Sequence, residues 1–571
     1  MKLGLLLLSS LAVSLFAQNP PADAAPPGAK CSVKGRVLNS VTAEPIRKAE
    51  LQLYEIPAAP PSSGPVTTSM PALENARAYT ATTDGEGRFL FAGVAPGRYQ
   101  LAAHRSGFRV QRYGARQRVS GEPILLSEDV PSREIALRMV PLGVIAGRIV
   151  DLEGDPVPGV FVTAAAYDYS DRGRHLQARA TATTSDLGEY RLFDLEPGRY
   201  YVHARPPGLL SRSPALSPAP LALTATFYPA GSDLANARPL DLGAGQQLTS
   251  VDLVLHPART ANLRGRVISP AGATNAFVVI QAPSSLNSPV EGVVATAAEG
   301  AFVMKGVSPG AYVLRAQCMV DDEQYVVQLP VQVGDSNLEG LELRPLPPVD
   351  LPGRLKIEGK TPLRPSKLQL FAQSGDPDSP GFASYSAAAV KDDGTFVFHN
   401  LSSGVYRIRI SATEIFYVKS IRLGDTDVSE SGLDPRERGA AELTFVIGTD
   451  VAQIEGSVVD AGSESIPPAA LTLVPVSALS LVSSPEKASP EKARRAFRTV
   501  STRDSKGNFV IRSVAPGTYK LFAWDSIESP YAMLYDPDLL KPFASMATTV
   551  QVSEGETKTV QVKLIRRPGE P

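Results

Sequence analysis

Gly306 to Gly310 read GVSPG, which matches the G-x-S-x-G pattern of the nucleophile elbow in serine hydrolases. That elbow presents its serine on a sharp turn between a strand and a helix. The corresponding stretches elsewhere in the chain read GVAPG and SVAPG, with Ala95 and Ala515 where Ser308 stands. We therefore interpret Ser308 as a turn residue. No catalytic residue is predicted, and the chain is not expected to be an enzyme.

Metal chemistry would need ligands at defined spacings. A zinc peptidase uses histidine and glutamate close together in sequence, whereas the histidines here have neither residue at metal-ligand spacing: His104, His175, His203, His256 and His399. His203 and His399 fall within predicted strands and are interpreted as surface or edge positions. No metal and no cofactor are predicted.

Acidic turns such as Asp84-Gly-Glu86 and Asp504-Ser-Lys506 resemble fragments of calcium loops. A calcium ion takes about six to eight oxygen ligands, and these turns do not supply that number. Asx turns, in which the aspartate accepts backbone N–H groups, are the simpler explanation. Calcium binding stays open as the alternative.

Composition limits the possible partners. The chain has 571 residues, a net charge of −1 and a pI of about 6.6, so no basic field is present to hold nucleic acid. It is too long for one core, and with 43% hydrophobic residues it is too apolar to be disordered. The two cysteines, Cys31 and Cys318, fall in different repeats, which predicts unpaired thiols.

The N-terminus reads MKLGLLLLSSLAVSLFAQ, in which Lys2 precedes an apolar run that ends near Phe16. This pattern is typical of a secretory signal peptide, with cleavage near Ala17 or Gln18. A membrane span would need about 20 apolar residues, so no span is predicted in the mature chain. The chain is therefore expected to be exported, to the periplasm, the cell surface or the extracellular space.

One sequence motif of about twenty residues occurs five times: Thr82–Leu101, Thr183–Val202, Thr296–Leu314, Lys391–Ile408 and Thr502–Leu521. Any functional site would have to be positioned by the secondary structure that this motif forms. Each copy has a glycine two residues before an aromatic residue, then a short strand, a Pro-Gly or Ser-Gly turn, and a tyrosine. Beyond the tyrosine, apolar and polar residues alternate, which is typical of a strand with one buried face. We predict that each copy of the motif is a β-hairpin whose tyrosine fills the core and bonds a nearby carbonyl.

Two strand-like pieces precede each copy of the motif, and the first contains a glycine, as in VKGRV at Val33. Glycine inside a strand indicates close backbone approach or a bend. About seven strands per unit fit a two-sheet sandwich. The predicted fold is all-β, with five tandem antiparallel Greek-key β-sandwiches joined by short connectors into a semi-rigid rod. The predicted boundaries are 1–18 for the signal peptide and 19–140, 141–257, 258–347, 348–448 and 449–571 for the sandwiches.

The glycine strand, the T-D-x-x-G-x-F turn and the P-G-x-Y-x-L strand together resemble the carboxypeptidase regulatory-like domain. The resemblance spans nearly all of the chain after the leader and is strongest in the first, second and fifth repeats. The third repeat has Ala297 where Asp84 stands, and the fourth has Ser403 in place of the turn proline. The resemblance implies a transthyretin-like (prealbumin-like) sandwich related to carbohydrate-binding folds, and a non-catalytic module of exported proteins. It transfers no binding residue.

Two loops place aromatic residues beside charged groups, and they provide the candidate ligand-binding residues: Tyr167, Tyr169, Arg174, Trp524, Tyr531 and Tyr535. For Trp524 and Tyr535 the tendency of aromatic residues to be buried favours packing at the sandwich edge over a ligand role. The predicted function is an exported, non-catalytic array for surface architecture or contact with envelope or extracellular proteins. The alternative is a carbohydrate-binding protein whose partner is a polysaccharide.

Overall fold

The computed structural model describes residues 31–56, 78–114, 123–170, 173–206, 221–232, 234–281, 292–296, 298–374, 385–411, 415–429, 431–437, 439, 441–460, 466, 469–476, 496–502, 504, 506–525, 532 and 540–566. The predicted signal peptide, together with Tyr531 and Tyr535, lies outside these ranges. Within them, no helix has the length and apolar character to cross a membrane.

The predicted all-β fold is confirmed, because strands arranged in facing sheets make up the regular structure of every repeat. In the first segment (19–140) one sheet has the order β4–β1–β8 (Arg88–Val94, Cys31–Asn39 and Ser132–Met139). The facing sheet has the order β3–β2–β5 (Ala78–Thr82, Glu50–Glu55 and Gly97–His104), with β6 (Gln111–Arg112) and β7 (Ile124–Leu126) beside β5. We call these the glycine sheet and the tyrosine sheet, after β1 and β5.

The next two segments repeat this plan. The second has the glycine sheet β12–β9–β17 (Glu189–Leu195, Gly143–Val150, Gln247–Leu248), with β18 (Leu253–Val254) also on β9, and the tyrosine sheet β11–β10–β13–β15 (Gly173–Thr183, Phe161–Ser170, Gly198–Arg205, Thr226–Phe227), with β16 (Leu240–Leu242) also on β13. The third has β23–β20–β26 (Ala301–Val307, Ala261–Val267, Leu338–Leu343) and β22–β21–β24–β25 (Gly292–Ala295, Thr274–Gln281, Gly310–Val320, Glu323–Val333).

The last two segments keep the same two sheets and add strands to them. The fourth has β30–β27–β34–β32–β33 (Thr395–Leu401, Val349–Glu358, Leu443–Gly448, Tyr417–Leu423, Thr426–Asp427) and β29–β28–β31 (Tyr385–Ala389, Gln369–Ser374, Tyr406–Ser411). In the fifth, β39 and β41 pair, so the two sheets join as β37–β36–β39–β41–β35–β38 (Arg498–Ser501, Ala470–Pro475, Gly517–Trp524, Thr557–Ile565, Ala452–Val459, Asn508–Val514), with β40 (Thr548–Val552) on β39.

Antiparallel pairing dominates, but in each segment the closing strand runs parallel to the glycine strand, as β8 does to β1. The glycine makes this pairing possible. A Cβ atom on Gly35 would stand 1.8 Å from the carbonyl oxygen of Ile135 in β8, and one on Gly456 would stand 1.7 Å from that of Val560 in β41. The predicted close backbone approach is therefore confirmed.

The hairpin prediction was wrong. The two strands of the repeated motif lie in opposite sheets, because β4 pairs with β1 whereas β5 pairs with β2, and the later segments do the same. The motif is therefore a β-arch that crosses from one sheet to the other. Near the end of the first strand of each arch one residue adopts a positive φ: Gly93, Asp194, Gly306, Asn400 and Ser513. This left-handed residue shifts the ladder and turns the chain toward the second sheet.

The tyrosine after each arch acts as predicted in the first, second and fifth segments. Its hydroxyl donates to the carbonyl oxygen four residues earlier, at 2.9, 2.7 and 2.7 Å, in the pairs Tyr99–Ala95, Tyr200–Glu196 and Tyr519–Ala515. In the fourth, the Tyr406 hydroxyl lies 3.2 Å from the hydroxyl oxygen of Ser402. The corner is thus tied to the core by a buried ring with a satisfied polar end.

Replacing Tyr99 by phenylalanine is expected to destabilise the first segment by about 1 kcal/mol, because the Ala95 carbonyl loses its donor while the ring stays packed. Hydrogen exchange of β4 and β5 in the full chain measures this change. Phenylalanine at Tyr54, whose hydroxyl bonds Gln100 outside the core, is the matched control. Equal protection in the two variants would contradict the corner role.

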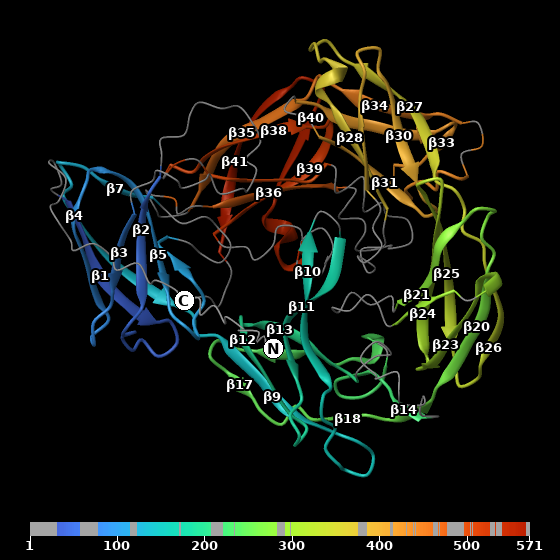
Figure 1. Ribbon diagram of the computed structural model, residues 1–571. Coiled ribbons are helices and arrows are strands. Elements are labelled where there is room, and N and C mark those ends of the chain that lie inside the picture. Colours follow the sequence, from blue (N-terminus) through green and yellow to red (C-terminus); the bar gives the residue numbers. More distant parts are fainter. Residues whose placement is uncertain are drawn as a thin grey trace, which may run out of the picture.

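A separate apolar core lies between the sheets of each segment. Cys31 belongs to the first core and Cys318 is buried in the third segment, and both thiols are free, as predicted. Figure 1 shows the segments following one another around an arc, with β10 and β11 reaching toward its middle. The array is therefore curved, in contrast to the expected rod.

Candidate interaction surface and segment junctions

The outer face of the second tyrosine sheet carries an unusual set of side chains. Strand β13 alternates, so that Tyr200, Val202 and Ala204 are buried in the core. The residues between them point to the other side of the sheet: Arg199, Tyr201, His203 and Arg205. An aromatic residue thus occupies the outward position that follows the corner tyrosine.

Strands β10 and β11 bring the predicted residues to this face. Tyr167 is half-buried, and its ring meets that of Tyr201 edge-to-face, with 5.6 Å between centroids. The Arg174 guanidinium carbon lies 3.7 Å from the Tyr167 ring centroid, which is a cation–π distance. Tyr169 pairs with Arg174 across the two strands. The structure therefore brings Tyr167 and Arg174 together with Tyr201.

A second ring and arginine lie at the other end of the face. Phe161 is 39% exposed, and the Arg205 guanidinium carbon lies 5.2 Å from its ring centroid. We call the whole set the second-segment face: Phe161, Tyr167, Arg174, Arg199, Tyr201 and Arg205. Rings that carry guanidinium groups on or beside them can stack against a flat ligand and pair with its carboxylates.

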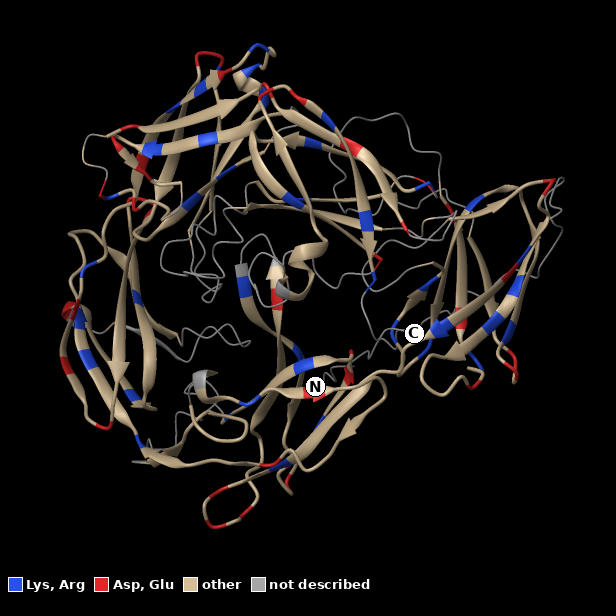
Figure 2. Ribbon diagram, turned by 180° about the vertical axis from the view of Figure 1, so that it is seen from behind, with Lys and Arg blue, Asp and Glu red and all other residues tan. Residues whose placement is uncertain are grey.

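The second-segment face carries three arginines, although the molecule as a whole is not basic. Acidic and basic residues are interspersed over the array in Figure 2. On this face Arg199 pairs with Asp241 at 3.0 Å. The pKa of Tyr201 is raised by burial and by Tyr167, and this effect is opposed by Arg174 and Arg199. The two arginines therefore act on the same ring.

The prediction for His203 was wrong. Its side chain is buried, because β15 pairs with β13 and the Phe227 ring lies against it, with 4.4 Å between ring centroids and 37° between planes. Burial, with a smaller contribution from Arg205, lowers the pKa of His203 to about 4. His203 is thus neutral near pH 7 and supports the sheet. His399, by contrast, is exposed as predicted and lies 2.8 Å from Asp350.

Trp524 is not accessible to a ligand, because its side chain lies in the interior of the fifth segment. It is fully buried in a small second cluster with Phe522, Leu540 and Phe543, which covers the outer face of the fifth tyrosine sheet. Its ring stacks on Phe522 at 5.4 Å and meets Phe543 edge-on at 5.1 Å. Trp524 therefore has the packing role that the sequence favoured.

Sequence reasoning missed Tyr201, Phe161 and Arg205. A signal was present, because the residue after each corner tyrosine points outward and is aromatic in one repeat alone: Gln100, Tyr201, Val313, Arg407 and Lys520. It was missed because two adjacent tyrosines, Tyr200 and Tyr201, do not show from sequence alone which ring faces the core. Only the pairing of β13 with β10 shows that Tyr201 and Tyr167 share a face.

The turns that resemble calcium loops or a nucleophile elbow have structural roles. The Asp84 carboxylate accepts the N–H groups of Glu86 and Arg88 at 2.9 and 2.8 Å, so the predicted Asx turn is confirmed. Asp504 does the same for Lys506 and Asn508. Ser308 lies between β23 and β24 in an arch, where the nucleophile elbow would need a helix.

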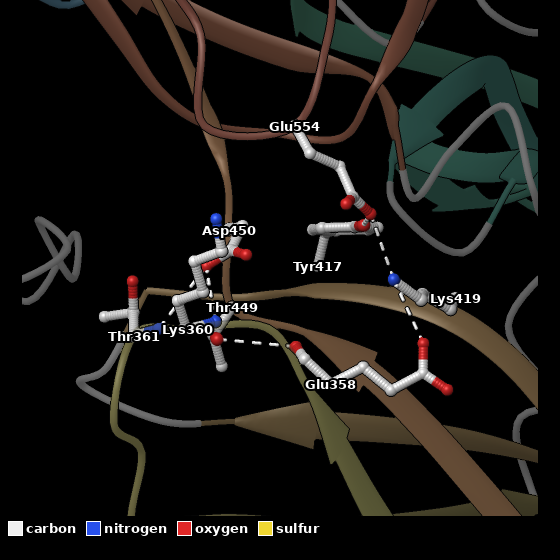
Figure 3. Close-up of polar contacts among 8 residues, drawn as sticks. All are labelled: Glu358, Lys360, Thr361, Tyr417, Lys419, Thr449, Asp450 and Glu554. Atoms are coloured by element: carbon white, nitrogen blue, oxygen red, sulfur yellow. Dashed lines mark hydrogen bonds and ion pairs between the residues drawn. The ribbon is translucent and has the colours of Figure 1, made fainter.

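The junction between the fourth and fifth segments is built from side chains on both sides (Figure 3). The Tyr417 hydroxyl donates to Glu554 at 2.6 Å, and Lys419 contacts Glu554 at 3.0 Å and Glu358 at 3.1 Å. The Lys360 N–H of the fourth segment donates to the Asp450 carboxylate of the fifth at 2.8 Å. Lys419 therefore bridges a carboxylate of each segment.

The charges at this junction reinforce one another. Hydrogen bonds from Tyr417 and then Lys419 lower the pKa of Glu554. Glu554 and then Glu358 raise the pKa of Lys419. Burial and the bond to Glu554 raise the pKa of Tyr417 to about 12. All three groups thus hold the protonation states that the contact needs near neutral pH.

The earlier junctions are bonded through the backbone. Leu142 donates to Gly107 at 2.8 Å between the first and second segments. Between the second and third, β14 (Leu221–Leu223) pairs with β19 (Pro257–Arg259). At the end of the third, Val326 and Leu346 exchange two hydrogen bonds, at 3.1 and 3.2 Å, and the Ser403 hydroxyl of the fourth segment donates to the Val326 carbonyl oxygen at 3.3 Å. Each connector is therefore held against a neighbouring segment.

Comparison with known proteins identifies one segment. Residues 144–255 match the carboxypeptidase regulatory-like domain, so the resemblance is shown for the second segment, which carries the second-segment face. No curated protein matches the chain.

Solved structures similar to parts of the chain include a streptococcal ancillary pilin (12% identity, 55% of this chain and 99% of that one, TM-score 0.20). Others are the minor pilin GBS52 of Streptococcus agalactiae (13%, 40% and 97%, 0.21) and the major pilin BcpA of Bacillus cereus (9%, 55% and 99%, 0.16). Similarity at these TM-scores says nothing about function.

Proposed function

We propose that this chain, whose second segment matches the carboxypeptidase regulatory-like domain, is an exported, non-catalytic array of five such β-sandwich domains. The domains correspond to 19–140, 141–257, 258–347, 348–448 and 449–571. The array serves as a curved scaffold for contact with other proteins of the cell surface or the extracellular space.

The observation that carries this proposal is the bonded junction. Flexible linkers would leave the domains free to rotate, whereas here each connector is paired with a neighbouring domain. The junction between the fourth and fifth domains adds a side-chain bridge from Tyr417 and Lys419 to Glu554. A fixed curvature suits a scaffold, because it presents its surfaces at constant spacing.

Small-angle X-ray scattering of the full chain tests this proposal. The wild type is expected to give one narrow distribution of dimensions at neutral pH, and the variant Lys419→Met with Glu554→Gln a broader one. Acid should broaden the wild-type distribution too. Since the pKa of Glu554 is lowered, its contribution is present above its ordinary pKa and is lost as the pH falls through the lowered value.

The variant controls for general acid effects, because it should lack the component of the acid response that Glu554 supplies. The exposed pair Arg88–Glu86, with Glu86→Gln, provides a control far from any junction. A wild type that is already broad at neutral pH would contradict the rigid scaffold.

A further inference from the structure

The fourth segment carries a second outer face of the same chemistry as the second-segment face. Phe371 in β28 and Tyr385 in β29 lie on the outer side of the tyrosine sheet, and their rings stack with 5.5 Å between centroids and 27° between planes. Tyr385 is 64% exposed. A stacked aromatic pair thus lies on this outer face, and its Tyr385 ring is open to solvent.

Arginines line the neighbouring strand. Phe371 pairs with Arg409 of β31, and Gln373 pairs with Arg407. Among the outward positions of β28, β29 and β31, the charged residues are these two arginines. We call this set the fourth-segment face: Phe371, Tyr385, Arg407 and Arg409. Its charge is positive in a molecule whose net charge is −1.

The two faces lie on the same side of the array. In Figure 1, β10 and β13 of the second segment and β28 and β31 of the fourth lie toward the middle of the arc, inside their glycine sheets. On the corresponding face of the fifth segment Trp524 is fully buried. Tyr167 and Tyr201 of the second segment also pack against a small cluster that contains Phe227, but both rings stay half-buried. The two faces are therefore turned toward the same, inner side of the arc.

We propose that the second- and fourth-segment faces are two platforms that bind one linear acidic polysaccharide. Aromatic rings stack against the C–H faces of sugar rings, and guanidinium groups form paired hydrogen bonds with carboxylates. A polyuronate presents both kinds of group at regular intervals. This inference goes beyond the scaffold role and does not depend on it.

The arrangement of the charges, rather than the composition, favours a polysaccharide over a protein partner. The centre of a protein interface is depleted of lysine and acidic residues but is itself enriched in aromatic residues and arginine. Here arginine lies between or over the rings, as Arg174 does on Tyr167 at 3.7 Å. Alternation of rings and cations matches a ligand whose apolar ring faces and carboxylates also alternate.

Binding of the full chain to polygalacturonate, measured by biolayer interferometry, tests the proposal. The fully methyl-esterified polymer is the matched probe, because it keeps the sugar rings and loses the charges. We expect the esterified form to bind at least about 10-fold more weakly, as charge-assisted hydrogen bonds are lost. Polygalacturonate binding should also weaken as salt rises.

Variants assign the binding to the faces. Tyr385→Ala and Tyr201→Ala should each weaken binding to polygalacturonate by up to about 10-fold through lost stacking. The combination, which damages both platforms, should weaken it by about 100-fold or more. Phe193→Ala removes an equally exposed aromatic side chain (59%) from the glycine sheet of the second segment, and it should bind like the wild type.

Three results would overturn the proposal. They are equal binding of both polymers, an equal loss in the Phe193 and Tyr385 variants, and no retention of polygalacturonate by chain that is folded by circular dichroism. Binding to a protein that is abolished by Tyr385→Ala, without polymer binding, would also replace it. None of these results would affect the scattering test of the scaffold.

Discussion

Replacing Gly35 by alanine is expected to destabilise the first segment by about 3 kcal/mol or more. The new Cβ would stand 1.8 Å from the Ile135 carbonyl oxygen and 2.8 Å from its carbon, and both atoms belong to backbone that cannot rotate away. The parallel pair of β1 and β8 would have to separate. That separation breaks the ladder on which the glycine sheet is built.

Hydrogen exchange followed by mass spectrometry measures this effect in the full chain, where the other segments serve as internal references. Amides of β1 and β8 should lose protection by about 100-fold, which corresponds to the expected free energy. Gly85→Ala is the control, because a Cβ there would meet nothing within 4 Å. If both variants exchange alike, the glycine is not required for close approach.

Replacing Trp524 by alanine is expected to destabilise the fifth segment by about 3 to 5 kcal/mol, as for other buried large-to-small substitutions. The ring is fully buried, and its removal leaves Phe522 and Phe543 without their shared partner. Loss of exchange protection in β36 and β39 would show the change. The fourth segment should keep its protection.

Trp524→Phe separates packing from hydrogen bonding. In the described part of the chain the indole N–H is buried without a hydrogen-bond partner, so phenylalanine removes an unpaired donor and keeps a ring in place. The cost should stay below about 1.5 kcal/mol. An alanine variant as stable as the phenylalanine variant would show that the second cluster contributes little.

Local patterns in the sequence were enough to predict strands, corners and turns. Alternation beyond Tyr99 and its relatives predicted which residues are buried, because a strand alone sets a period of two. Glycine in β1 predicted close approach, since any larger side chain would collide. Asp84 could be predicted as an Asx-turn residue because its partners, the N–H groups of Glu86 and Arg88, lie within five positions of it in the chain. Each of these properties depends on near neighbours in sequence.

What the tertiary structure decided depends on partners far along the chain. A short turn between two amphipathic strands is compatible with a hairpin or an arch, and only the pairing of β4 with β1 and of β5 with β2 selects the arch. His203 is buried because Phe227 of β15 lies against it, and no local sequence pattern predicts this contact. Tyr167 and Tyr201 meet because strand pairing joins residues that are distant in sequence. The array curves because junction contacts do the same between segments. Neither kind of contact can be predicted from spacing along the chain.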